Sequence, residues 1–290
     1  MKTLRKVKKV TKGVSTTDGA GVKLVRVIGY NDTKDYDPFL MLDAFDSVNP
    51  DDYTKGFPWH PHRGIETVTY LINGNIEHGD SLGNKGVIRD GDCQWMTAGS
   101  GIIHQEMPKA SPRMLGAQLW LNLPAKDKMT LPAYGDIRSE DIPKVEKDGV
   151  TIRILSGEYE GQKGAFEGRY IKAVYLDVEL SACREWSFET DPDSTLFIYM
   201  FYGKGIFDPE KSIENPKDVF DERQAILFGE GSVFWIKGAA DTRFILLSAK
   251  PIKEPIAWGG PIVVNTREEL KLAFEELRNN TFIKSHDIRL

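Results

Sequence analysis

Short runs rich in Val, Ile, Leu, Tyr and Phe recur along this chain and are separated by clusters of Gly, Asp and Asn. Runs of this length between turn-forming residues are typical of strands, and many of them in succession indicate an all-β sandwich or barrel. The runs lie at residues 21–28, 66–72, 114–123, 150–155, 170–180, 195–201, 232–236 and 242–248. We therefore expect an all-β protein with a few short helices.

One segment near the C-terminus has helical periodicity instead. Residues 266–269 read Thr-Arg-Glu-Glu, which is a capping box. Leu270, Phe274 and Leu277 follow at helical spacing before an Asn-Asn pair ends the segment. We expect a helix here, with an apolar stripe that docks on a sheet.

Charge and composition exclude several classes of protein. A net charge of −5 over 290 residues provides no basic face for direct nucleic-acid binding. No apolar run approaches the roughly 20 residues of a membrane span. The basic segment 2–12 lacks the apolar core of a secretory signal, and its Val7 and Val10 alternate with lysines as in an exposed edge strand. Cys93 and Cys183 form no disulfide framework, so we expect a cytoplasmic protein.

The middle of the chain changes in character. Residues 134–149 are rich in charge and proline, a composition that is poor at burying a face and favours a connection between domains. Strand-like sequence resumes at residue 150. The expected organisation is an N-terminal metal-binding domain over 1–138, a linker over 139–149 and a C-terminal domain over 150–290.

Two short pairs of possible metal ligands occur in the first half: His60-Pro-His62 and His104-Gln-Glu106. Side chains at i and i+2 of a strand point to the same face. If both segments are strands that line one cavity, three imidazoles and a carboxylate converge. The spacing therefore predicts a mononuclear metal site made of His60, His62, His104 and Glu106.

The other histidines have no partner at metal-ligand spacing. His78 and His286 are isolated, and we expect both to be solvated. No histidine lies between His104 and His286, so the C-terminal domain cannot hold a nitrogen-rich metal site. That domain is expected to support the fold, close the pocket or contact a partner.

Four protein ligands leave two positions of an octahedral ion open, which is the mark of a reactive site. Fe(II) suits three imidazoles and one carboxylate best. The same donor set also accepts Zn, Mn, Ni, Co or Cu, because affinity order alone does not select iron.

Two motifs and a C-terminal segment resemble one family. Residues 56–67 read GFPWHPHRGIET, residues 94–108 read QWMTAGSGIIHQEMP, and residues 251–265 read PIKEPIAWGGPIVVN. Together they resemble the pirin family of the cupin superfamily, over nearly the whole chain. The resemblance implies two tandem cupin barrels, with iron ligands at His60, His62, His104 and Glu106. Glu66 stands where many single-barrel cupins have their carboxylate ligand, and here it is expected to be structural or to support the ligands from behind.

The resemblance also implies an activity. Similar proteins act on flavonols such as quercetin, so a quercetin 2,3-dioxygenase type of reaction with O₂ is expected, with Glu106 as general base. A second interpretation is a non-enzymatic, redox-responsive regulator that binds protein partners. A third is a metal site for an unrelated small acid or enol.

Further residues are candidates for the substrate pocket. Phe57, Trp59 and Trp95 neighbour the motifs and could form its walls, although large aromatics in a β protein are more often core. Gln118 has the strand parity of a cavity-facing residue. Arg63 is a weaker candidate for orienting substrate, because its position after His62 predicts a side chain that points away from the metal.

Overall fold

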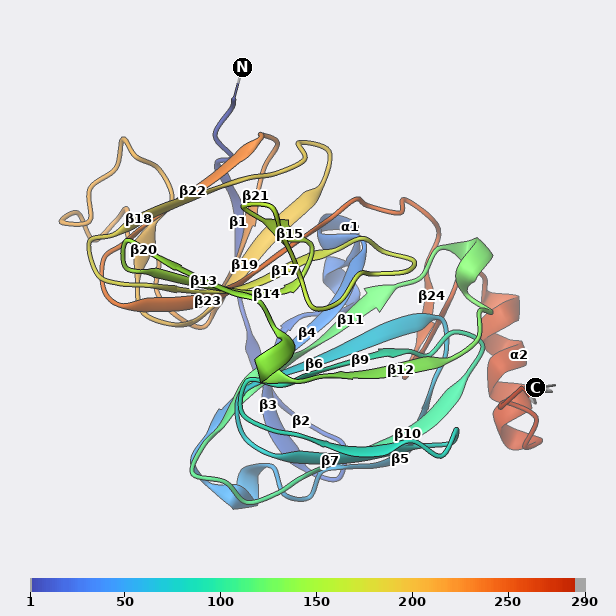
Figure 1. Ribbon diagram of the computed structural model, residues 1–290. Helices are drawn as coiled ribbons and strands as arrows, with labels where there is room; N and C mark the ends of the chain where they lie inside the picture. Colours follow the sequence, from blue (N-terminus) through green and yellow to red (C-terminus); the bar gives the residue numbers. More distant parts are fainter. Residues whose placement is uncertain (1, 285–290) are drawn as a thin grey trace. The chain divides into compact units, whose positions relative to one another are not determined.

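A computed structural model describes residues 2–284 as two compact β units, each assembled from separated stretches of sequence (Figure 1). The histidine unit comprises residues 14–33, 38–139 and 252–284 and contains His60, His62 and His104. The histidine-free unit comprises residues 2–13, 34–37 and 140–251.

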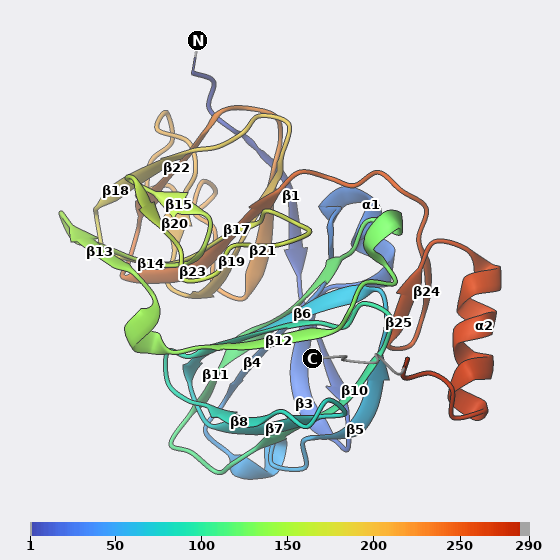
Figure 2. The same cartoon turned by 45° about the vertical axis from the view of Figure 1, so that its right-hand side comes forward.

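In the histidine unit, a seven-stranded and a four-stranded antiparallel sheet form the framework. The larger sheet has the order β12-β9-β6-β11-β4-β3-β2, and the smaller has the order β5-β10-β7-β8. Two short strands, β24 and β25, precede helix α2, and the three lie side by side in Figure 2. The strands are β2 (Val14–Asp18), β3 (Val22–Ile28), β4 (Phe39–Ser47), β5 (Phe57–His62), β6 (Ile65–Asn73), β7 (Ile76–Asp80), β8 (Lys85–Ile88), β9 (Cys93–Thr97), β10 (Ile102–Pro108), β11 (Met114–Asn122), β12 (Ala133–Ile137), β24 (Ala257–Gly259) and β25 (Ile262–Val264).

The histidine-free unit repeats the arrangement of a long sheet and a short one. Its seven-stranded sheet has the order β1-β21-β19-β23-β17-β14-β13, and its three-stranded sheet has the order β18-β22-β20. The strands are β1 (Val7–Lys12), β13 (Lys144–Lys147), β14 (Val150–Ser156), β15 (Glu158–Tyr159), β16 (Gln162–Lys163), β17 (Val174–Leu180), β18 (Glu185–Glu189), β19 (Thr195–Tyr202), β20 (Gly205–Ile206), β21 (Gln224–Phe228), β22 (Val233–Gly238) and β23 (Thr242–Ala249).

Alternating side chains build the core of this second unit. Inward residues of β14, β17, β19 and β23 join aromatic residues such as Trp186, Phe234 and Phe244 in one buried cluster. Because i and i+2 share a face of a strand, the alternation in the sequence produces this continuous apolar layer. β1 is the edge strand that the lysine alternation predicts.

The expected linker is the main correction to the sequence analysis. The charged stretch 134–149 contains two strands: most of β12, and β13, which pairs antiparallel with β14. Both lie at the ends of their sheets. A strand at the edge of a sheet needs to bury only one of its faces. In β13 the side chain of Val145 forms that buried face, because it packs on the core cluster.

The C-terminal segment also differs from the expected boundaries. Residues 252–284, expected in a domain over 150–290, belong to the histidine unit. An apolar contact explains this assignment, since Val263 packs in one buried cluster with Leu40, Ile65 and Trp120 of the histidine unit.

Helices are few and short. Helix α2 (Arg267–Arg278) is confirmed with its capping box, in which Thr266 accepts from the Glu269 backbone and Glu269 accepts from that of Thr266. The others are α1 (Thr33–Tyr36) and the 3₁₀ turns η1 (Tyr30–Asp32), η2 (Pro50–Asp52), η3 (Ala125–Asp127) and η4 (Ser139–Asp141).

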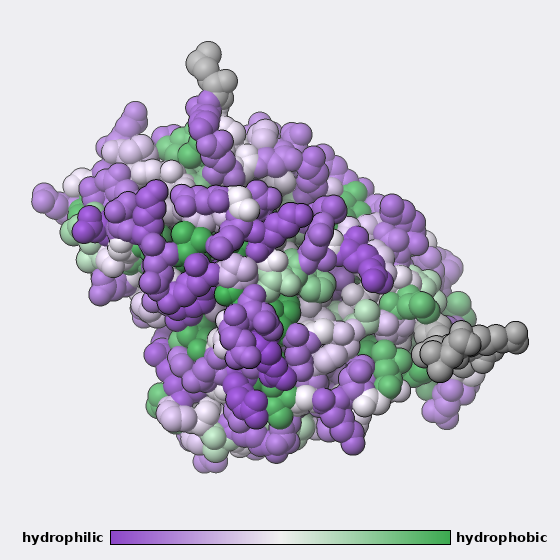
Figure 3. Space-filling model, viewed as in Figure 1, coloured by the Kyte–Doolittle hydropathy of each residue, from purple (hydrophilic) through white to green (hydrophobic). Residues whose placement is uncertain are grey.

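The face seen in Figure 3 is mainly hydrophilic, and its hydrophobic residues form small separate patches. Within residues 2–284, no helix has the length and apolar character needed to traverse a lipid bilayer.

Candidate metal centre

Two neighbouring strands carry the three histidines. β5 and β10 pair antiparallel, with His104 opposite His60 and Ile102 opposite His62. The candidate ligand atoms of His60, His62 and His104 all lie within 4.8 Å of one another. The convergence of three imidazoles, predicted from the i, i+2 spacing, is therefore present.

Backbone carbonyls fix the orientation of two of these rings. His60 Nδ1 lies 2.9 Å from the Pro58 carbonyl oxygen, and His62 Nδ1 lies 3.2 Å from that of Pro261. A carbonyl only accepts, so each Nδ1 carries the proton and donates. The Nε2 lone pairs of both rings are then available for a metal.

The inward nitrogens fit a cation. His60 Nε2 and His62 Nε2 lie 3.1 Å apart. Two ligands at right angles, each about 2.1 Å from one ion, would be about 3 Å apart. His104 Nε2 is buried and has no hydrogen-bond partner within the described residues. A buried nitrogen without a partner is costly unless something binds it, and a metal ion would do so.

Burial keeps two of the rings neutral. Burial lowers the pKa of His62 to about 3, and the neighbouring His60 adds to the effect. Burial also lowers the pKa of His104 well below its ordinary value. Neutral imidazole is the form that binds metal, so these rings are ready to ligate at neutral pH.

Glu106 lies on the same strand as His104 and on the same face. It is 2% exposed; Thr69 Oγ1 donates to its Oε1 at 3.0 Å, and Gln118 Nε2 donates to its Oε2 at 3.3 Å. The ligand atoms of the three histidines all lie within 4.8 Å of one another, and Glu106 does not belong to this group. Two donors thus hold its carboxylate on the face of β10 that also carries His104, and its role as fourth ligand stays a prediction.

The aromatic pocket candidates occupy three different environments. The Phe57 ring centroid is 6.4 Å from that of His60, and Phe57 packs partly on an apolar cluster. Trp59 is 54% exposed. Trp95 is buried but follows Gln94, which pairs in register with Thr69, so strand alternation turns Trp95 to the opposite face. Trp95 is therefore core, and the expectation that it forms a pocket wall is wrong.

Two neighbouring strands of the large sheet carry Gln118, which the sequence analysis selected, and also Thr69 and Trp120, which it did not. Gln118 and Trp120 of β11 share a face, and the Trp120 ring centroid is 4.9 Å from that of His62. Thr69 of β6 pairs with Gln118 in register. Gln118 and Trp120 are two residues apart on one strand, so the cavity-facing parity of Gln118 could have identified Trp120. Nothing in the sequence indicates which strand brings Thr69 to Glu106.

Arg63 points away from the histidine face, as its position predicts, but it does not orient substrate. Its Nε donates to the Ser100 carbonyl at 2.7 Å, and one terminal nitrogen donates to the Phe282 carbonyl at 2.9 Å. The other forms an ion pair of 2.7 Å with Glu276 of α2. Arg63 is 3% exposed, so the guanidinium is a buried tether for the C-terminal segment.

Glu66 is structural. It is fully buried and accepts a hydrogen bond of 2.7 Å from Thr97. It precedes Thr67 on β6, so alternation places it on the face opposite to that of Thr67 and Thr69. This agrees with the expectation that Glu66 is not a ligand.

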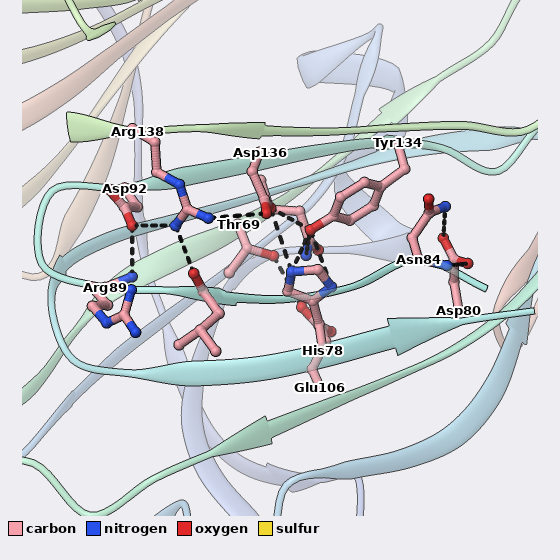
Figure 4. Close-up of polar contacts among 12 residues, drawn as sticks. Thr69, His78, Asp80, Asn84, Arg89, Asp92, Glu106, Tyr134, Asp136 and Arg138 are labelled. Carbon is pink, nitrogen blue, oxygen red and sulfur yellow. Dashed lines mark hydrogen bonds and ion pairs between the residues drawn. The ribbon is translucent and has the colours of Figure 1, made fainter. Parts of the chain in front are cut away.

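His78 is buried, and the expectation that it is solvated is wrong. Its strand β7 lies between β10 and β8, with His78 directly opposite Glu106. Figure 4 shows the ring beside Tyr134 and Asp136 of β12, with His78 Nδ1 3.0 Å from the Tyr134 hydroxyl. Burial raises the pKa of Tyr134, and Asp136 raises it further, so Tyr134 stays protonated and donates to Asp136. His286 lies outside the described residues.

Two family models match the chain. The Pirin model matches residues 21–121, and the model of the Pirin C-terminal cupin domain matches residues 175–283. A pirin-like protein of Caulobacter vibrioides is 41% identical over 96% of this chain and 99% of its own length. A Pseudomonas aeruginosa protein provisionally named quercetin 2,3-dioxygenase is also 41% identical, over 95% of this chain and 97% of its own length.

A solved structure extends the similarity to the fold. The crystal structure of quercetin 2,3-dioxygenase from Acinetobacter baumannii superposes with a TM-score of 0.87 at 30% identity. The match covers 96% of this chain and 98% of the other. The two β units are therefore two cupin domains, as the sequence motifs predict.

Proposed function

This chain belongs to the pirin family, and we propose that it is a metal-dependent dioxygenase that acts on a flavonol such as quercetin. The observation that carries the proposal is the set of three converging histidines, with His62 and His104 buried and His104 Nε2 without a partner in the described chain. The names of two relatives, one compared by sequence and one by structure, support the choice of substrate.

We assign His60, His62, His104 and Glu106 as the residues that hold the ion, with Fe(II) as the expected metal. Three neutral nitrogens and one carboxylate suit Fe(II) and leave room for substrate. When bound, the ion supplies Lewis-acid and one-electron chemistry. The protein's own part is to orient His60 and His62, which the Pro58 and Pro261 carbonyls accomplish. It also keeps His62 and His104 neutral, because burial lowers the pKa of both.

Glu106 is assigned as the base that takes the proton of the substrate hydroxyl. A base needs a fixed position within hydrogen-bond reach of that proton. Thr69 and Gln118 fix the carboxylate from the large sheet. Trp120, against His62, lies on the same face as Gln118 and contributes an apolar wall beside the ligands.

The test is to load anaerobic protein with Fe(II), quantify bound metal, add quercetin and follow O₂ uptake together with loss of the flavonol absorbance. His62→Ala is the control. We expect wild type to bind one metal per chain and to consume O₂ catalytically, and we expect His62→Ala to lose most of the metal while staying folded by circular dichroism.

Two outcomes would contradict the proposal. Full metal retention in His62→Ala would disprove the assigned ligand set. Stoichiometric metal without O₂ uptake would exclude quercetin as substrate and favour a metal-dependent regulator that binds protein partners.

A further inference from the structure

Strands β6 and β11 carry four polar-tipped side chains in two successive layers, on the face of the sheet that meets Glu106 and His62. Gln118 pairs in register with Thr69, and Trp120 pairs in register with Thr67. Each strand contributes residues at i and i+2, so all four side chains share one face of the sheet. The layers therefore differ in position along the strands and not in the side to which they point.

The first layer is satisfied by the protein itself. Thr69 Oγ1 and Gln118 Nε2 donate to the two oxygens of Glu106, at 3.0 and 3.3 Å. This layer shows that the shared face is directed at the metal centre. It also shows what the second layer lacks, which is an acceptor.

The second layer has two donors without acceptors. Thr67 is 1% exposed and Trp120 is 9% exposed. Thr67 Oγ1 and Trp120 Nε1 are both buried, and neither has a hydrogen-bond partner among residues 2–284. Buried polar groups in native proteins are nearly always hydrogen-bonded, so two adjacent exceptions indicate a missing acceptor.

The position of this layer identifies the acceptor's surroundings. The Trp120 and His62 rings meet edge to face with centroids 4.9 Å apart. Thr67 is directly opposite Trp120 in the antiparallel pair. The Cβ atoms of such residues are about 4.5–5.5 Å apart, so the two side chains leave the sheet from neighbouring points on the same face. Indole N–H can only donate, which requires an acceptor and favours an oxygen with negative charge.

Building on the proposed function, we infer that Thr67 and Trp120 are positioning residues that donate from Oγ1 and Nε1 to a deprotonated enol oxygen of the ligand bound beside the three histidines. The pair selects substrates that offer such an oxygen, as the 3-hydroxyl of a flavonol does. A compound without that oxygen leaves both donors unsatisfied and is bound less tightly.

One experiment measures the ligand-free protein. Thr67→Val removes a hydroxyl that has no protein partner, so the melting temperature should be unchanged or raised. The matched control is Thr242→Val in the other unit, since Thr242 is equally buried at 1% and its hydroxyl has carbonyl acceptors at 2.9 Å, those of Lys204 and Ala240. The control should melt a few degrees lower. A comparable loss in Thr67→Val would show that its hydroxyl already has a partner and would overturn the inference.

A second experiment measures binding without turnover. Zn(II)-loaded wild type, Thr67→Val and Trp120→Phe are titrated anaerobically with quercetin and with the same flavone lacking the 3-hydroxyl, after metal content is measured. Each variant should retain metal and bind quercetin roughly tenfold more weakly, with little change for the 3-deoxy compound, since one such hydrogen bond is worth about a factor of ten.

The outcomes separate this inference from the proposed function. If wild type binds quercetin and both variants bind it equally well, the positioning role is wrong while the flavonol substrate stands. If wild type binds neither compound, the flavonol function fails and the enol ligand fails with it. If the variants lose affinity for both compounds alike, Thr67 and Trp120 do not bind the 3-oxygen of the flavonol, and the positioning role is wrong.

Discussion

At the scale of single residues, the centre depends on backbone and side-chain groups that hold the proposed ligands in place. Pro58 and Pro261 contribute only carbonyl oxygens, yet these set the tautomers of His60 and His62. In the same way, Glu106 owes its position to hydrogen bonds from the facing sheet. Substitutions that keep shape but change charge or donors are therefore the informative ones.

Glu106→Gln should keep part of the metal and lose most turnover. The amide has nearly the shape of the carboxylate, so three imidazoles can still hold an ion, but it cannot accept the substrate proton. Removal of a general base usually costs about 10²–10⁴ in rate. The measurement is O₂ uptake per bound metal with quercetin, beside Thr69→Val, which keeps the carboxylate and should lose much less. Turnover per metal equal to wild type would exclude Glu106 as the base.

At the scale of elements, the segment β24-β25-α2 completes the histidine unit. Pro261 precedes β25 and accepts from His62. Lys128 is buried and donates from Nζ to the Gly64 and Val263 carbonyls, at 2.8 and 3.0 Å, and to the Asn122 side chain. α2 is tied to the end of β5 by the Arg63–Glu276 ion pair. Val263 also packs in an apolar cluster with residues such as Ile65. The polar contacts are buried as well, so part of the strength of the attachment depends on charge.

The Arg63–Glu276 ion pair of α2 should make the free energy of unfolding decrease as the pH becomes acidic. Burial works to raise the pKa of Glu276, but Lys284 and Arg63 outweigh it and the pKa lies below its ordinary value. A carboxyl group with a lowered folded pKa stabilises the fold above the unfolded pKa of about 4.3, and this contribution is lost as pH falls through the folded pKa. Glu276→Gln should therefore lower the free energy of unfolding by about 1–3 kcal/mol at pH 7.

The check is urea unfolding of both proteins between pH 7 and pH 3. The difference in unfolding free energy between wild type and Glu276→Gln should shrink below about pH 4.3. Glu268→Gln, at an exposed position in the first turn of α2, is the control and should behave like wild type. A difference that stays constant over the whole range would show that the Glu276 charge does not act through this linkage.

At the scale of the whole molecule, the two units exchange segments of sequence. The histidine unit takes its last part from residues 252–284, and the histidine-free unit takes β1 from the N-terminus. Neither unit is therefore a contiguous piece of the chain. This arrangement makes domain boundaries in the sequence a poor guide to what folds independently.

A fragment of residues 1–149 should fail to form the metal centre, although it contains all four proposed ligands. It lacks Pro261 and Val263, whose carbonyls accept from His62 and Lys128, and it lacks Glu276, which pairs with Arg63. Loss of the partners of buried polar and charged groups costs several kcal/mol, comparable to the stability of a domain. Circular dichroism and Zn(II) binding of the fragment and the full chain are the measurement. A folded fragment with full metal affinity would contradict this prediction.

The sequence alone determined whatever depends on local geometry. The i, i+2 spacing placed His60 with His62, and His104 with Glu106, because alternation is a property of every strand. The capping box located α2, and turn residues separated the strands, for equally local reasons. Sequence motifs identified the family, because they consist of the residues next to the histidines in the chain.

Only the tertiary structure decided what depends on pairing between distant strands. It buried His78 beside Tyr134, turned Trp95 into the core, and made strands of the charged stretch 134–149. It also paired Thr67 with Trp120 and left both donors without an acceptor among residues 2–284. A strand's sequence fixes which residues share a face, whereas the register and order of strands fix what that face meets, and these come from contacts between distant parts of the chain.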